Sequence, residues 1–139
     1  MLERAGTGSG IQLMMLSGKA ATEKMRESIV EANARPAREN DRRARQVRSS
    51  AGIAVFVSAK NDKAHWIESG RCYERFALQA TALGIRNAML NQPVEVASGR
   101  PELAHAFGLG DRQPDLVVRS GGGPKMLQSL RRPLPALCE

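Results

Sequence analysis

The sequence predicts an α+β or α/β domain in which helices pack around a single sheet. Short apolar runs, each of strand length, alternate along the chain with longer segments whose apolar residues recur every three or four positions. The 139 residues are enough for one domain with a buried core, so we expect one unit over residues 1–139. Aromatic residues make up only 4% of the chain, so this core must be mainly aliphatic.

The first half of the chain predicts a strand, a helix and a second strand. Residues 11–16 form a short apolar run bounded by glycines, as expected of a strand. A helix is expected to begin near Gly18, because apolar residues recur at helical spacing up to Ala32, and Pro36 then interrupts the pattern. The clearest strand is residues 52–58, a continuous run rich in β-branched residues that is typical of the centre of a sheet.

Between these elements lies an arginine-rich segment. Residues 35–48 contain six arginines against Glu39 and Asp41, so this segment carries a local charge of +4 and has almost no apolar face. It fits a solvated helix or loose connector, and it also fits an anion-binding arm.

The second half predicts a long helix, two further strands and a short helix. Asn61 or Asp62 is expected to cap a helix that ends at Gly84. Residues 85–90 resemble a short strand, and Pro93 interrupts the chain. A helix is expected over residues 100–107 and a last strand over residues 115–119, followed by a glycine-rich turn and an extended tail.

Composition restricts the classes of function. The net charge of +7 suits nucleic acid or a phosphate-bearing ligand. No apolar run reaches the length of about 20 residues that a membrane span needs, and no signal peptide is visible. Cys72 and Cys138 lie far apart and form no CxxC pair, so we expect no zinc site, no disulfide framework and a cytoplasmic location.

Few side chains suggest catalysis on their own. His65 and His105 are forty positions apart and are expected to be ordinary surface or core histidines. Glu68 and Glu74 do not share a helix face, so they form no carboxylate dyad. Cys72 lies at a buried helix position that disfavours a thiolate nucleophile.

Six blocks in order carry a resemblance to a known family. The stretch from Ser49 onward resembles the flavin-dependent nitroreductases, and residues 1–48 diverge from them. The matching blocks are residues 53–58, 66–70, 74–85, 90–96, 114–121 and 129–133. The resemblance implies an α+β fold with a mixed or antiparallel sheet flanked by helices, a homodimer, and a chain corresponding to the C-terminal half of the family.

The resemblance also implies a cofactor and its site. The segment after the long helix would run along the edge of the isoalloxazine ring of FMN, which places Leu90, Asn91 and Gln92 there. The family's basic pair that holds the FMN phosphate matches Arg131 and Arg132. Without the family, Asn91 and Gln92 fit a turn before Pro93, and the arginines fit a solvated pair.

The implied activity is ping-pong electron transfer. NAD(P)H would reduce FMN, and a nitro or quinone acceptor would then take the electrons. The family places an Arg-x-Ser-x-Arg motif on its N-terminal helix, and no such motif lies near the start of this chain. A degenerate remnant, a non-catalytic dimeric scaffold and a basic module that binds nucleic acid or another polyanion therefore remain alternatives.

Overall fold

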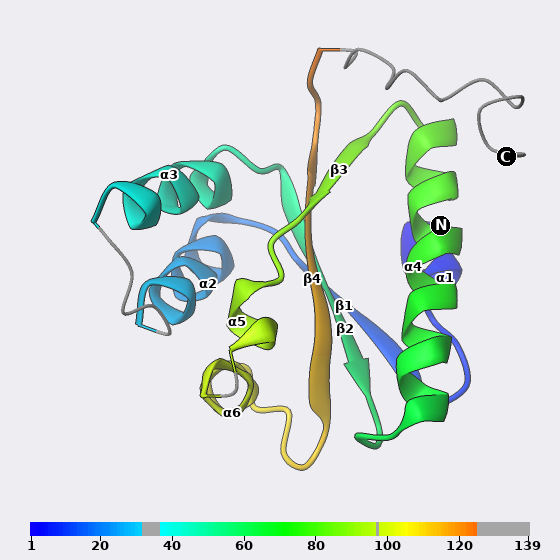
Figure 1. Cartoon of the computed structure of the whole chain (residues 1–139). Coiled ribbons are helices and arrows are strands. Elements are labelled where there is room, and N and C mark those ends of the chain that lie inside the picture. Colours follow the sequence, from blue (N-terminus) through cyan, green and yellow to red (C-terminus); the bar gives the residue numbers. More distant parts are fainter. Residues whose placement is uncertain (32–36, 97, 125–139) are drawn as a thin grey trace, which may run out of the picture.

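The protein is described by a computed structural model that covers residues 1–31, 37–96 and 98–124. Its centre is a four-stranded antiparallel sheet in the order β1-β2-β4-β3 (Figure 1). The strands are β1 (Ile11–Leu16), β2 (Gly52–Ser58), β3 (Arg86–Met89) and β4 (Gln113–Gly121). Because every described pairing is antiparallel, the fold is α+β, which confirms the expected class.

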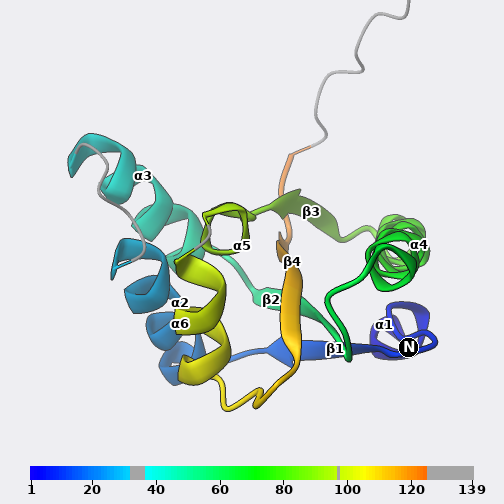
Figure 2. The same ribbon diagram turned by 60° about the horizontal axis from the view of Figure 1, so that its bottom comes forward.

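Helices cover both faces of this sheet. One face carries the long helix α4 (Lys63–Ala82) together with α1 (Leu2–Ala5), as Figures 1 and 2 show. The other face carries α2 (Lys19–Glu31), α3 (Ala37–Arg48), α5 (Gln92–Glu95) and α6 (Gly99–Ala106). In the described ranges no helix combines the length and apolar character needed to cross a membrane.

The central strand β2 divides the core into two layers. All seven of its residues are buried, and it pairs with β1 on one side and β4 on the other, as predicted for the centre of the sheet. Side chains alternate between the two faces of a strand. Val55 therefore packs among the helices α2, α3, α5 and α6, whereas Phe56 packs against Phe76 of α4, with ring centroids 5.7 Å apart.

The ends of α4 have the expected chemistry. The Asp62 carboxylate accepts a hydrogen bond from the backbone N–H of His65 at 3.0 Å, which caps the first turn. Gly84 follows the helix at φ +71°, a left-handed conformation that glycine adopts without steric cost. Both boundaries confirm the sequence prediction.

The structure decides between two alternatives for one segment and differs from the expectation for two short elements. The arginine-rich segment is a helix, α3, which packs through the fully buried Val47; this resolves the choice between helix and connector. Pro93 was expected to interrupt the chain, but it lies in the one-turn helix α5. A proline fits the first turn of a helix because the N–H groups there have no partner within the helix, so the missing N–H costs nothing. The N-terminal turn α1 was not predicted, and four residues provide too short a periodic pattern.

Candidate functional site

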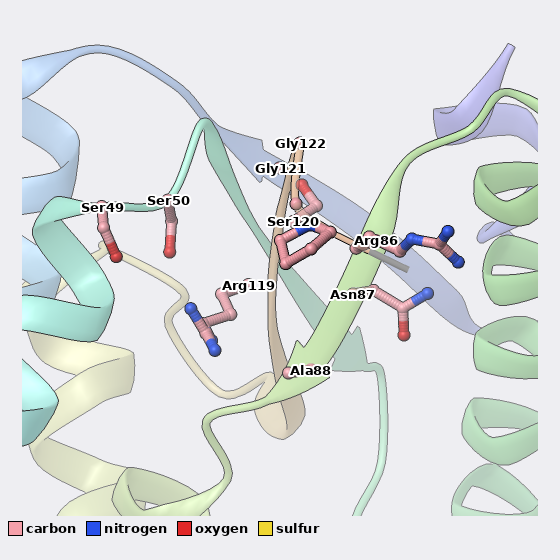
Figure 3. A pocket seen from close by; sticks show the side chains of 11 residues that line it. Ser49, Ser50, Arg86, Asn87, Ala88, Arg119, Ser120, Gly121 and Gly122 are labelled. Atoms are coloured by element: carbon pink, nitrogen blue, oxygen red, sulfur yellow. The ribbon is translucent and has the colours of Figure 1, made fainter. Parts of the chain in front are cut away.

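A cavity of about 420 Å³ lies where β4 ends beside β3 and the connection from α3 to β2 (Figure 3). This size is within the range of about 300–1,000 Å³ that is common for small-molecule pockets. We call it the β3–β4 cavity. Its walls come from three separate parts of the chain: residues 49–50, residues 86–88 and residues 119–124.

The antiparallel register brings these residues together. Asn87 pairs with Ser120, and Ala88 pairs with Arg119. In Figure 3 the Arg119 side chain extends toward Ser49 and Ser50, whereas Asn87 extends toward α4. The Asn87 amide oxygen accepts a hydrogen bond from the hydroxyl of Tyr73 at 3.1 Å, so this side chain ties β3 to α4.

Two cationic groups of the cavity remain available for a ligand. Within the described part of the chain, the guanidinium groups of Arg86 and Arg119 have no hydrogen-bonding or ion-pairing partner, and no acidic residue lines the cavity. The hydroxyls of Ser49 and Ser50 both donate to the carbonyl oxygen of Gln46, at 3.2 and 2.7 Å. The cavity is therefore electropositive, and an arginine fork suits a phosphate or a carboxylate group.

A glycine permits the close approach of two walls. A Cβ added to Gly121 would lie 3.3 Å from the backbone nitrogen of Ala51, closer than most side-chain contacts. The backbone of Ala51 itself donates to the carbonyl of Ser120 at 2.9 Å. The glycine thus lets the end of β4 lie directly against the start of β2.

The predicted ring-edge residues lie next to this cavity in sequence, but their side chains have structural roles. Leu90 and Gln92 are only 4% and 6% exposed. The Asn91 amide oxygen accepts a hydrogen bond from the backbone N–H of Val117 at 2.9 Å, and the Leu90 N–H donates to the Val117 carbonyl at 2.7 Å. From the segment after α4, Asn87 and Ala88 line the cavity itself.

The predicted phosphate residues, Arg131 and Arg132, lie outside the described residues. Arg86 and Arg119 were not predicted as site residues. Arg86 lies near the start of one predicted strand and Arg119 at the end of another, and the pairing register that brings the two strands together cannot be read from either strand alone.

The other titratable groups form no catalytic set in the described ranges. Burial raises the pKa of the fully buried Cys72 thiol, as expected for an inert cysteine. Glu68 faces Arg75 at 3.4 Å, and His65 lies 2.7 Å from the carboxylate of Asp62. No group of three potential metal ligands occurs among the residues described.

Comparison with known proteins identifies the fold. No protein-family model and no curated protein matches the chain. Among solved structures, a Bacteroides fragilis nitroreductase with bound FMN is 15% identical, with a TM-score of 0.71 over 96% of this chain and 81% of that one. A nitroreductase-like family protein from Bacillus cereus is 13% identical, with a TM-score of 0.72 over 99% and 80%. A Desulfitobacterium hafniense nitroreductase with bound FMN is 16% identical, with a TM-score of 0.70 over 95% and 80%.

These matches confirm the resemblance at the level of the fold. The chain has the nitroreductase fold, and the neighbours' chains are longer. The similarity of fold covers 99% of the chain in the comparison with the Bacillus cereus protein. The chain spans about four fifths of each neighbour's length.

Proposed function

We propose that the protein binds FMN in the β3–β4 cavity and acts as a nitroreductase-type oxidoreductase. The observation that carries the proposal is a cavity with two guanidinium groups, Arg86 and Arg119, that have no partner among the described residues, in a chain with the nitroreductase fold. Three neighbours of that fold are described as having FMN bound. When bound, FMN would accept a hydride from NAD(P)H and deliver electrons to a nitro or quinone acceptor.

The residues present fit part of such a cofactor. Arg119 would neutralise an anionic group near Ser49 and Ser50, and Arg86, which extends in the opposite direction (Figure 3), would contact a different part of the ligand. Gly122 has no heavy atom within 4 Å of an added Cβ, so this wall has room for a ring or ribityl chain. The backbone of Asn91 and Gln92 is proposed to meet the ring edge, while the Asn91 side chain holds that backbone on β4. Arg131 and Arg132 are proposed to hold the phosphate.

The proposal is tested by titrating the purified chain with FMN and following quenching of flavin fluorescence. Arg119→Ala is expected to weaken binding about tenfold or more, because a hydrogen bond to a charged group contributes about 1.5–3 kcal/mol. Arg131→Ala combined with Arg132→Ala is expected to weaken it further. Arg71→Ala is the matched control, because Arg71 is an exposed arginine on α4 outside the cavity. Equal affinity of all the variants, or no binding by the native chain, would refute the site.

We also propose a homodimer with α4 at or near its interface. Ile67 and Leu78 are 55% and 66% exposed, and their separation of eleven residues corresponds to three helical turns. They therefore lie on one face of α4, which also carries Arg71 and Glu74 between them. Analytical ultracentrifugation tests this proposal. We expect the native chain to sediment as a dimer and Leu78→Glu to sediment as a monomer, and a monomeric native chain would contradict the proposal.

One observation favours a second function, binding of a polyanion. Arg42, Arg45 and Arg48 are exposed and spaced three residues apart, so α3 presents a stripe of positive charge. Binding of single- or double-stranded nucleic acid through this stripe would weaken steeply between low and physiological salt. An affinity that does not change with salt would exclude it.

A further inference from the structure

A second cavity, of about 320 Å³, lies at the other half of β4 and shares no residue with the β3–β4 cavity. We call it the Asp115 cavity. Helix α4 provides one wall, β4 provides the floor, and the start of α6 provides one residue. It is lined by Trp66, Ser69, Gly70, Arg100, Asp115 and Leu116.

An irregularity in β4 brings its acidic residue to this cavity. Phe56 pairs with Leu116 and the next residue, Val57, pairs with Pro114, so Asp115 is an extra residue without a partner on β2. Such a bulge breaks the alternation of side chains and redirects one of them. Consequently Asp115 and its neighbour Leu116 line the same cavity rather than opposite faces of the sheet.

The polar groups of the cavity are not satisfied by the described part of the protein. Both carboxyl oxygens of Asp115 and the hydroxyl oxygen of Ser69 are buried without a hydrogen-bonding partner there. Ser69 is only 1% exposed. Burial raises the pKa of Asp115, although the hydroxyls of Ser58 and Ser69 and the charges of Arg100 and His65 oppose this effect. Buried polar groups without partners are rare and point to a missing donor.

A positive group lies on the same cavity without neutralising the carboxyl group. The Nε atom of Arg100 donates to the carbonyl of Val94 at 2.5 Å, which anchors the side chain. Its two terminal nitrogens have no partner among the described residues. The cavity therefore offers one negative and one positive group that do not form an ion pair with each other.

The remaining walls are apolar and open. Trp66 is 49% exposed, and its indole N–H donates to the Asn61 side chain at 2.9 Å, which fixes the orientation of the ring. Leu116 adds an aliphatic surface. Gly70 has no heavy atom within 4 Å of an added Cβ, so the wall of α4 leaves space at this position.

We propose that the Asp115 cavity binds a free α-amino acid with an apolar side chain. Its ammonium group would donate to Asp115 and Ser69, its carboxylate would accept from Arg100, and its side chain would pack on Trp66 and Leu116. Binding would require the Asp115 carboxyl group, whose oxygens are covered and have the hydroxyls of Ser58 and Ser69 nearby, to turn into the cavity toward the ammonium donor. A ligand with a single charge would leave one of the two groups without a charged partner, so both charges are needed to match the cavity.

The first test compares three ligands by isothermal titration calorimetry on the native chain at pH 7. L-Leucine carries both charges, 3-methylbutylamine lacks the carboxylate, and 4-methylpentanoate lacks the ammonium. We expect binding of leucine and at least tenfold weaker binding of each analogue. Binding of the amine as tightly as leucine would overturn the zwitterion assignment, and absence of binding by all three would overturn the site.

The second test uses matched variants whose folding is checked by thermal unfolding. Asp115→Asn and Arg100→Gln are each expected to weaken leucine binding at least tenfold. Asp111→Asn and Arg71→Gln remove the same charges outside the cavity and are expected to leave the affinity unchanged. Similar losses in the control variants, or native affinity in both cavity variants, would refute the assignment. FMN binding plays no part in either test, so the proposed oxidoreductase function stands or fails separately.

Discussion

The side chain of Asn91 gives the sharpest test of how the segment after α4 is held in place. Its amide oxygen is the acceptor for the backbone N–H of Val117, a residue with 0% exposure. Asn91→Ala removes the acceptor but leaves the buried donor, and an unsatisfied buried donor costs about 1–3 kcal/mol. For a chain of this size, each kcal/mol lowers Tm by about 3–5 °C.

The measurement is urea denaturation followed by circular dichroism, with Asn61→Ala as the matched control. Asn61 also accepts a hydrogen bond at 2.9 Å, but its donor is the half-exposed Trp66, which water can satisfy after the substitution. We expect Asn61→Ala to change the free energy of unfolding by less than about 0.5 kcal/mol. Equal losses for the two variants would show that burial of the Val117 N–H does not determine the cost.

Two further outcomes follow from backbone conformation and from charge burial. Gly84→Ala is expected to destabilise the chain by about 1 kcal/mol, because φ is +71° at this position. Gly70→Ala is expected to stabilise it by about 0.5–1 kcal/mol, because Gly70 lies inside α4 with open space around it. Thermal unfolding should therefore show a lower Tm for the first variant and a higher Tm for the second. The raised pKa of Asp115 means that the native chain binds more protons than the unfolded chain, despite the nearby charges of Arg100 and His65. Stability should therefore fall as pH rises from about 4 through the raised pKa, and Asp115→Asn should remove this slope in pH-dependent denaturation.

Elements with a strong periodic signal were predictable from sequence. The run of residues 52–58 predicted the central strand because a strand buried on both faces needs apolar side chains at every position. Asp62 and Gly84 marked the ends of α4 through capping chemistry, which is local. The arginine-rich segment was ambiguous because its helix, α3, depends on the buried Val47, and its remaining residues give no apolar periodicity.

The sites were less predictable because they depend on pairing between distant strands. Arg86 and Arg119 line one cavity only because Ala88 lies opposite Arg119 in the antiparallel register. The Asp115 cavity depends on a bulge, and a single extra residue between Pro114 and Leu116 leaves no mark in the hydrophobic pattern. Asn91 was predicted to lie along the edge of a flavin ring, and no sequence pattern predicted that its amide oxygen accepts a hydrogen bond from Val117 of β4.

The unequal lengths of the last two strands explain why β4 carries two separate cavities. β4 has nine residues and β3 has four, so β3 pairs only with residues 118–121 (Figure 1). Next along β4, the Leu90 N–H donates to the carbonyl of Val117 and the Asn91 amide oxygen accepts from the N–H of Val117. This contact ends the hydrogen-bonded part of the β4 edge. Beyond it, Asp115 and Leu116 have no strand on that side, so side chains of α4 and α6 form the wall of a cavity there. Because Asn91 lies at the boundary, loss of its hydrogen bond should loosen the edge of β4 next to both cavities, and Asn91→Ala should weaken binding of FMN and of leucine together.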